Sequence, residues 1–248
     1  MKDIGDLRKI AVLIDADNAQ CSKMKLILEE ISAHGHIIVK RAYGDWSSDF
    51  LKKWKKELNE LVIQPIQQFA YTTGKNCTDT AMIIDAMDLL YTAKFDAFVL
   101  VSSDSDFTRL ASRLRESEIF VFGVGEKKTP ISFRNVCDDF IFTENISETD
   151  TVDESNKTKK EENNNTIKEI RTLLDKAWEI YHDDEGWVNV SSAGQFIKRA
   201  KPDFDPRSYG FSKLPDLVSS MTNYYEMTKY PGKGTVIIIA YKLKGNRK

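Results

Sequence analysis

The 248-residue chain has too few cysteines and no apolar run long enough for several classes of protein. Its three cysteines include no Cys-x-x-Cys pair, which argues against a disulfide scaffold or a thiolate zinc site and fits a reducing compartment. No apolar run approaches about 18 residues, the length of a membrane-spanning helix, and the N-terminus MKDIGDLRKI is too charged for a signal peptide. We therefore expect a cytoplasmic protein without a membrane span.

The small net charge of −2 conceals a difference between the two ends of the chain. Residues 1–147 contain 19 Lys+Arg and 22 Asp+Glu, a net charge of −3, whereas residues 167–248 contain 14 and 10, a net charge of +4. The basic C-terminal part is weak evidence for a polyanionic partner.

A polar segment separates these two parts. Residues 148–166 (ETDTVDESNKTKKEENNNT) contain one aliphatic residue, Val152. Such a segment buries too little apolar surface to offset its ordering entropy, so it predicts a flexible linker between two domains, residues 1–147 and 167–248.

The first part alternates between strand and helix patterns. Strands are expected at residues 9–14, 37–42, 95–101, 119–124 and 140–142, a short apolar run lies at 62–66, and helices are expected at 22–32, 47–61, 78–91 and 106–116. Nearly continuous apolar strands alternating with helices predict an α/β fold with a parallel sheet covered by helices on both faces.

Carboxylates follow two of these strands. Asp104 and Asp106 follow the strand in VLVSSDSDF, and Asp15 and Asp17 follow the first strand in IDADNA. An Asp or Ser after a strand can simply form a turn or cap a helix. Because ligands of parallel sheets bind at the carboxyl ends of the strands, however, these side chains are expected to meet at one edge.

A third carboxylate, Asp79, opens the helix in GKNCTDTAMIIDAMDLL. At 100° per residue, Met82, Ile83, Ala86 and Leu90 lie within about 60° of Asp79, so Asp79 is expected at the start of the buried face of the helix. The alternative interpretation is that Asp79 only stabilises the N-terminus of the helix through its negative charge.

Asp85 and Asp88 fall on the other side of this helix in the same projection. They are expected to form a solvated stripe, although a supporting position for Asp85 near the site stays open.

Several carboxylates at one edge would repel one another unless a cation joins them. Oxygen ligands without His or Cys favour Mg²⁺ or Mn²⁺, and a water bound to such an ion is a nucleophile suited to phosphodiesters. Asn18, Ser102 and Ser103 are candidates to orient that water or bind a phosphate, and Lys75 is a candidate to neutralise phosphate charge.

The motifs VLIDADN, GK followed by an Asp at a helix start, and VLVSSDSDF resemble, in this order, the NYN domain family of PIN-like ribonucleases. The resemblance covers the chain to about residue 145. It implies a Rossmann-like, PIN-type fold and a metal-dependent endoribonuclease. It also implies a metal-binding catalytic cluster of Asp15, Asp79, Asp104 and Asp106, with Asn18 beside it.

The C-terminal part predicts helices closed by a two-stranded wing, which describes a small winged-helix domain. The run GWVNVSSAGQFIKRAKPDFDPRSYGFSKLPDLV strongly resembles the OST-HTH, or LOTUS, domain, and the resemblance covers about residues 167–244. It implies binding of RNA, or in some members of protein. The positions that match are Arg207, Tyr209, Lys213, Lys229 and Lys233. Core packing is an equally good interpretation of Tyr209, and solvated surface is the alternative for the lysines.

Three other functions stay open at this point. A haloacid-dehalogenase-like phosphatase also begins with Asp-x-Asp, but it usually has Thr or Val where this chain has Ala19. A non-catalytic RNA-binding adaptor would have lost activity at the acidic edge. A DNA-binding regulator lacks support because no strongly basic recognition helix is present. The leading hypothesis is an RNA-directed nuclease, with homo-oligomerisation and a protein partner left open.

Overall fold

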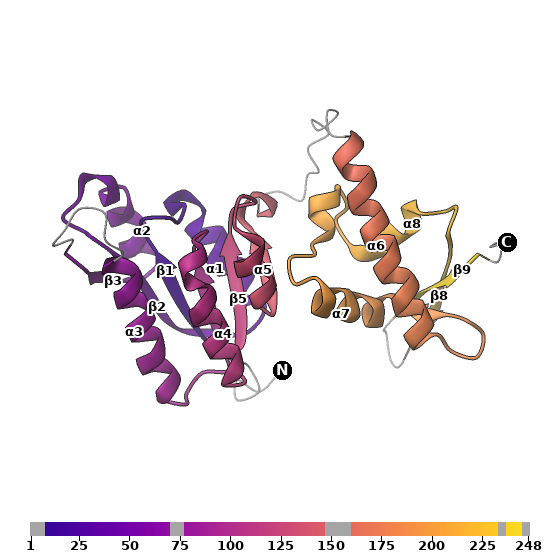
Figure 1. Ribbon diagram of the computed structural model, residues 1–248, viewed down its shortest axis with the longest axis horizontal. Helices are drawn as coiled ribbons and strands as arrows, with labels where there is room; N and C mark the ends of the chain where they lie inside the picture. The colour runs from indigo at the N-terminus through magenta and orange to yellow at the C-terminus, as the bar shows by residue number, and fades with distance from the viewer. Residues whose placement is uncertain (1–7, 70–76, 147–159, 233–236, 245–248) are drawn as a thin grey trace. The chain divides into compact units, whose positions relative to one another are not determined.

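The computed structural model describes residues 8–69, 77–146, 160–232 and 237–244, with the side chains of the helix at 160–181 described from residue 168. The chain divides into two compact units, residues 1–148 and 149–248 (Figure 1). None of the described helices is long and apolar enough to cross a membrane.

The first unit is built on a six-stranded sheet in the order β3-β2-β1-β4-β5-β6, and every neighbouring pair is parallel. Its strands are β1 (Lys9–Asp15), β2 (His36–Gly44), β3 (Gln64–Gln67), β4 (Ala97–Val101), β5 (Phe120–Gly125) and β6 (Asp139–Phe142). The predicted α/β fold with a parallel sheet is therefore confirmed.

Helices cover both faces of this sheet, as predicted (Figure 1). They are α1 (Met24–Ser32), α2 (Trp54–Glu60), α3 (Cys77–Tyr91), α4 (Thr108–Glu116) and α5 (Ile131–Val136), with 3₁₀ turns η2 (Cys21–Lys23), η3 (Asp49–Leu51), η4 (Ser105–Phe107) and η5 (Thr143–Asn145). Residues of α1 and α2 pack on one face, and residues of α3, α4 and α5 pack on the other.

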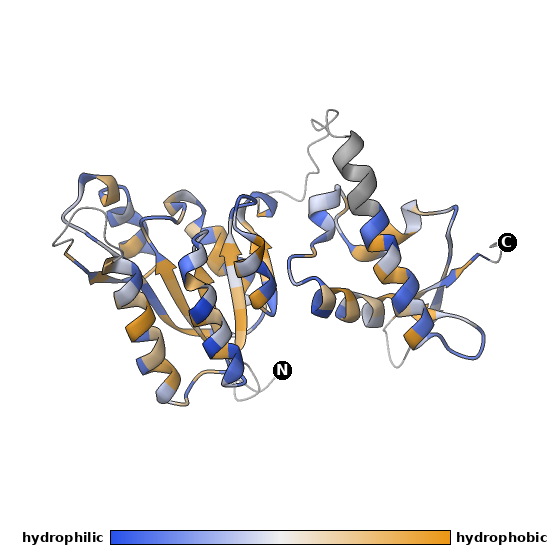
Figure 2. Cartoon of the chain, in the orientation of Figure 1, coloured by the Kyte–Doolittle hydropathy of each residue, from blue (hydrophilic) through white to orange (hydrophobic). Residues whose placement is uncertain are grey.

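The central strand β1 supplies both cores because successive side chains of a strand point to opposite faces. Ile10, Val12 and Ile14 enter the core with α1 and α2, whereas Ala11 and Leu13 enter the core with α3 to α5. Figure 2 shows the strands of this sheet as mainly hydrophobic. Each fully buried aliphatic side chain of this kind contributes about 1.5–3 kcal/mol to folding, which fixes the sheet and hence its edges.

The expected helix at 47–61 is shorter than predicted and begins at Trp54. The preceding residues are held in turns, because the Asp45 carboxylate accepts hydrogen bonds from the backbone and hydroxyl of Ser47, and Ser48 Oγ accepts one from the backbone N–H of Phe50. Such local side-chain bonds compete with a helix.

The second unit consists of helices packed on a three-stranded antiparallel sheet in the order β7-β9-β8. Its elements are α6 (Lys160–Tyr181), β7 (Val188–Asn189), α7 (Val190–Ala200), η6 (Pro206–Tyr209), α8 (Leu214–Ser220), β8 (Tyr225–Pro231) and β9 (Ile237–Leu243). Its core joins Ile170 and Leu174 of α6, Ile197 of α7, Leu217 of α8 and Tyr241 of β9. This is the predicted winged helix, with β8 and β9 as the wing.

One boundary differs from the prediction. Helix α6 begins at Lys160, so residues 160–166 are helical, although 148–166 were all predicted as flexible linker. A low apolar content does not exclude a helix, and the Lys and Glu residues at the start of this segment are good helix formers. Residues 147–159 lie outside the described part of the chain, and the linker there stays a prediction.

Candidate functional site

The site lies at the carboxyl ends of β1 and β4, which are neighbours in the sheet. The chain continues from β1 to β2 and β3 on one side, and β4 begins the other half, so the strand order changes direction between β1 and β4. In open parallel sheets this switch point is where ligands bind. Asp15 is the last residue of β1, and Asp104 follows the end of β4.

Three carboxylates meet at this edge. Asp79, Asp104 and Asp106 each offer an oxygen, and these oxygens all lie within 4.8 Å of one another. Asp79 comes from the first turn of α3, whereas Asp104 and Asp106 come from the turn after β4. The structure therefore brings together three of the four predicted metal ligands from segments about 25 residues apart in the sequence.

The turn after β4 is shaped by its own side chains. Asp104 is the N-cap of η4, and its Oδ1 accepts a hydrogen bond of 2.9 Å from the backbone N–H of Asp106. Capping by Asp satisfies a backbone donor that the helix leaves unpaired. The same bond keeps the Asp106 residue close to the Asp104 carboxylate.

Asp15, the fourth predicted ligand, is fully buried and is not one of these three carboxylates. Its Oδ2 accepts hydrogen bonds from Asn18 Nδ2 at 2.8 Å and from Ser102 Oγ at 2.7 Å. Burial raises the pKa of Asp15, and these two bonds oppose that rise by stabilising the charged form. The two bonds thus fix the position of the Asp15 carboxyl group beneath the edge of the sheet.

The two serine hydroxyls that were predicted to bind substrate are used within the protein. Ser102 Oγ donates to Asp15 and also accepts a bond of 3.0 Å from the backbone N–H of Asp104. Ser103 Oγ accepts a bond of 2.9 Å from the backbone N–H of Glu126, which follows β5. Both serines therefore join the strand ends, a role that the sequence pattern did not indicate.

The mutual repulsion of the acidic residues is visible at Asp79. Burial, and then the charges of Asp15, Asp104, Asp106 and Asp17, raise the pKa of Asp79 to about 6. A nearby cation would reverse this effect by favouring the ionised form. The oxygen-only donor set of Asp79, Asp104 and Asp106 fits a hard divalent cation.

A further carboxylate at this edge was not predicted. Asp45 follows β2. Burial raises the pKa of Asp17, a hydrogen bond from Thr78 opposes this rise, and the negative charge of Asp45 adds to it. The signal in the sequence was available, because Asp45 follows an apolar strand end as Asp15 does.

Asn18 is exposed beside Asp15, and Lys75 lies outside the described residues.

The expected solvent position of Asp85 is wrong. Its carboxylate forms an ion pair with Arg41 and accepts a hydrogen bond from the hydroxyl of Tyr43, both of which come from β2. Burial and the bond to Asp85 raise the pKa of Tyr43, so its hydroxyl stays a donor. Asp85 thereby fastens α3 to β2.

The error lay in the assumed rotation of the helix. The buried residues of α3 are Met82, Ala86 and Leu89, so the centre of its buried face lies about 60° from Asp79 rather than on it. Asp79 and Asp85 lie on opposite borders of that face. Asp88 is exposed, as predicted.

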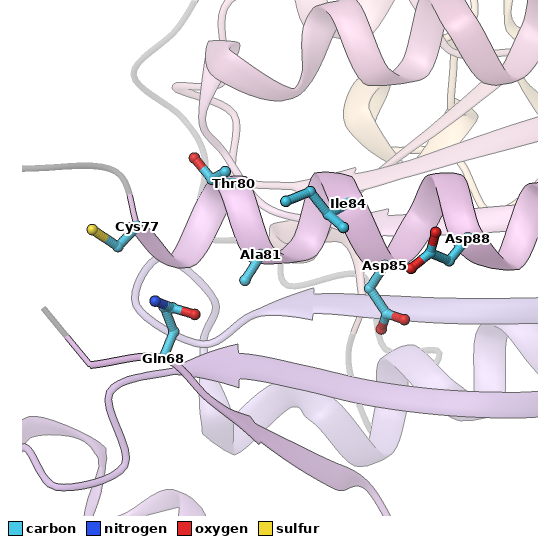
Figure 3. Close-up of a pocket in the computed structure, with 7 residues that line it drawn as sticks. All are labelled: Gln68, Cys77, Thr80, Ala81, Ile84, Asp85 and Asp88. Carbon is cyan, nitrogen blue, oxygen red and sulfur yellow. The ribbon is translucent and has the colours of Figure 1, made fainter.

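A hollow of about 620 Å³ lies beside α3 and is separate from the three carboxylates. Figure 3 shows it between the N-terminal half of α3 and Gln68, with Asp85 directed toward the strands. None of Asp79, Asp104 and Asp106 lines it. The carboxylate cluster, rather than this hollow, is therefore the candidate active site.

In the second unit the predicted RNA-binding residues differ in their availability. The Arg207 guanidinium contacts both oxygens of the buried Asp205 at 2.9–3.1 Å, and the Tyr209 ring packs against the core, 5.8 Å from that of Phe204. Lys213 and Lys229 are exposed. Lys233 lies outside the described residues.

Comparison with known proteins gives two family matches. The model described as "NYN domain" matches residues 9–147, and the model described as "OST-HTH/LOTUS domain" matches residues 162–237, which confirms both resemblances. Among the curated proteins, no relative matches. One similar solved structure is a protein of unknown function from Vibrio parahaemolyticus RIMD 2210633, with 17% identity, coverage of 57% of this chain and 96% of that chain, and a TM-score of 0.47.

The raised pKa of Asp79 predicts a pH-dependent stability effect. Since folding raises this pKa from 3.8 to about 6, the folded protein binds the proton more tightly and loses stability as the pH rises through this range. Asp79→Asn should stabilise the metal-free protein at pH 8 by at most about 1 kcal/mol, because solvent screens this partly exposed group. The gain should vanish near pH 4. Urea unfolding in chelator at both pH values measures it, and Asp88→Asn is the control on the same helix.

The contacts of Asp85 predict a stability effect that is independent of metal. Asp85→Ala leaves the buried Tyr43 hydroxyl and the Arg41 guanidinium without their partner, so it should cost about 2 kcal/mol of unfolding free energy. Asp88→Ala should change it by less than about 0.5 kcal/mol because the side chain is exposed. Equal losses in the two variants would contradict the assigned helix rotation.

Proposed function

Because the chain belongs to the NYN domain family, we propose that it is a divalent-metal-dependent endoribonuclease that cleaves RNA phosphodiester bonds. The observation that carries the proposal is the group of three carboxylates, Asp79, Asp104 and Asp106, at the switch point of the parallel sheet. A phosphodiester is itself an anion, so this acidic edge suits it only when a cation lies between them.

In this proposal Asp79, Asp104 and Asp106 hold Mg²⁺ or Mn²⁺, and Asp15 supports them from beneath. When bound, the cation supplies a Lewis acid that lowers the pKa of water and offsets charge on the phosphate. Above pH 6 most Asp79 carboxylates are ionised even without the cation, and this leaves the group able to bind it near neutral pH.

The positioning of the acidic residues is assigned to neighbouring polar groups. Ser102 links the Asp15 carboxylate to the backbone of Asp104, and Asn18 bonds to the same oxygen of Asp15. These bonds hold the ends of β1 and β4 in one arrangement before substrate arrives. Such preorganisation limits the rearrangement required during reaction.

The OST-HTH/LOTUS domain is proposed as the module that captures RNA. Residues 167–248 carry a net charge of +4, which favours a polyanion. Its exposed Lys213 and Lys229 are better candidates for phosphate contacts than Arg207, whose guanidinium is paired with Asp205. Binding of a protein partner or a second copy by this module is an alternative that the RNA experiment below tests.

The central prediction concerns Asp104. Asp104→Asn removes one negative ligand but retains an oxygen that can cap η4, so the fold should persist. Cleavage of labelled single-stranded RNA in Mn²⁺ should fall at least about 100-fold, above the range for residues that only support a metal ligand. Chelator should abolish wild-type cleavage, and Asp88→Asn should cleave like the wild type.

Two experimental outcomes would favour a different function for this protein. Wild-type protein that cleaves no RNA with any divalent cation would favour a non-catalytic RNA-binding adaptor. A covalent phosphate on Asp15 would favour the phosphatase chemistry, although the full burial of Asp15 opposes it.

A separate prediction concerns the division of labour between the two units. The fragment spanning residues 160–248 should bind RNA, with a slope of log K against log salt of about −2 if Lys213, Lys229 and Lys233 each contact one phosphate. Residues 1–147 should still cleave in Mn²⁺ but require more substrate, because the second unit no longer raises the effective RNA concentration. Absence of binding at low salt would reassign the second unit to protein interaction and leave the nuclease proposal intact.

A further inference from the structure

The segment of η3 and α2 carries a dense group of positive charges in an otherwise acidic unit. Residues 50–56 (FLKKWKK) contain four lysines and no acidic residue, whereas residues 1–147 as a whole contain more Asp+Glu than Lys+Arg. All four lysines are exposed, and Phe50 is 87% exposed. We call Phe50, Lys52, Lys53, Lys55 and Lys56 together the lysine strip.

Buried neighbours hold the lysine strip in this orientation. Leu51 and Trp54 are buried in the core beneath it, and the Trp54 ring packs edge-on against Trp46. Trp46 is fixed in turn because its indole N–H donates to the carbonyl of Ile66. With Leu51 and Trp54 filling the core, the lysines and Phe50 must face solvent.

The charges of the lysine strip are largely available to a ligand. Lys52 pairs with Asp49 and Lys56 with Glu60, but these are exposed pairs, which contribute little and exchange readily. Lys53 and Lys55 form no ion pair with the described residues. Four positive charges and an exposed ring within seven residues are a combination typical of single-stranded nucleic acid binding.

The lysine strip belongs to the segment that leaves the sheet at the same edge as the carboxylates. Asp45 and η3 follow the end of β2, and β2 is separated from β4 by β1 alone. Two strand spacings amount to about 10 Å, so the end of β2 lies roughly that far from the end of β4. A polyanion repelled by the carboxylates would find compensating charge on the segment that follows this strand end.

We propose that the lysine strip holds single-stranded RNA beside the acidic edge, with the lysines contacting phosphates and Phe50 stacking on a base. This inference rests on the proposed function for the fate of the RNA, but the binding itself requires no metal. An acidic protein could use the lysines, but it would not require a flat aromatic ring. The stacking role of Phe50 therefore distinguishes RNA from such a partner.

The test compares variants of the full chain in chelator, so that RNA is bound and not cleaved. Phe50→Ala should weaken binding of a labelled single-stranded RNA at least about fivefold, and Phe50→Trp should restore it, because one stacked base accounts for that factor or more. Lys53→Ala with Lys55→Ala should reduce the slope of log K against log salt by about 1.4. Ultraviolet cross-linking should label the peptide that contains Phe50.

Matched controls come from the opposite edge of the same sheet. Tyr91 ends α3 and is 73% exposed, so Tyr91→Ala removes another largely exposed ring. Lys94 follows α3, Arg113 lies in the last turn of α4, and both are exposed, so changing both to Ala removes the same charge as the lysine variant. These controls should bind and cross-link like the wild type.

The outcomes separate this inference from the proposed function. Unchanged affinity, salt slope and cross-linking in the Phe50 and lysine variants would overturn the role of the lysine strip, whether or not the protein cleaves RNA. Equal losses in the variants and in their controls would also overturn it, because binding would then follow total charge. A wild type that fails to cleave, but whose RNA binding depends on Phe50, would overturn the nuclease proposal alone.

Discussion

The adjacency of β1 and β4 in the parallel sheet is the constraint on which the candidate site depends. Backbone hydrogen bonds between these two strands, which are buried on both faces, bring the chain after Ile14 beside the chain after Val101. Asp15 and Asp104 then share one edge, and the Ser102 hydroxyl can bridge them. Loss of this pairing would separate Asp15 from Asp104, although the local bond from the backbone N–H of Asp106 to Asp104 would remain.

Concentrating carboxylates at one edge has an electrostatic cost. Burial, and then the charges of four neighbouring carboxylates, disfavour the ionised form of Asp79 and raise its pKa. The protein tolerates this cost through fixed hydrogen bonds to Asp15 and through the attachment of α3 to β2 at Asp85. The same repulsion opposes an approaching polyanion, and in the proposed function the lysine strip and the basic residues of the second unit offset it.

Much of the fold followed from periodicity, because buried parallel strands leave an unmistakable apolar pattern. The positions of Asp104 and Asp106 after β4 and of Asp79 at the start of α3 could be predicted for the same reason. The rotation of α3 about its axis could not be predicted in this way. Its amphipathic pattern is weak, because Ile84 is exposed while Ile83 and Leu90 are only partly buried, so contact with β2 rather than periodicity determined which side is buried.

The sequence by itself determined the two families, the succession of strands and helices along the chain and the residue types available for chemistry. All three depend on local pattern and motif. Only the tertiary structure decided which polar groups meet. Asp15 is buried and engaged by Asn18 and Ser102, Asp85 is paired with Arg41 and Tyr43, and Arg207 is paired with Asp205. Hydrogen bonds and ion pairs act over a few ångströms, and the packing of distant segments alone brings such groups within that range.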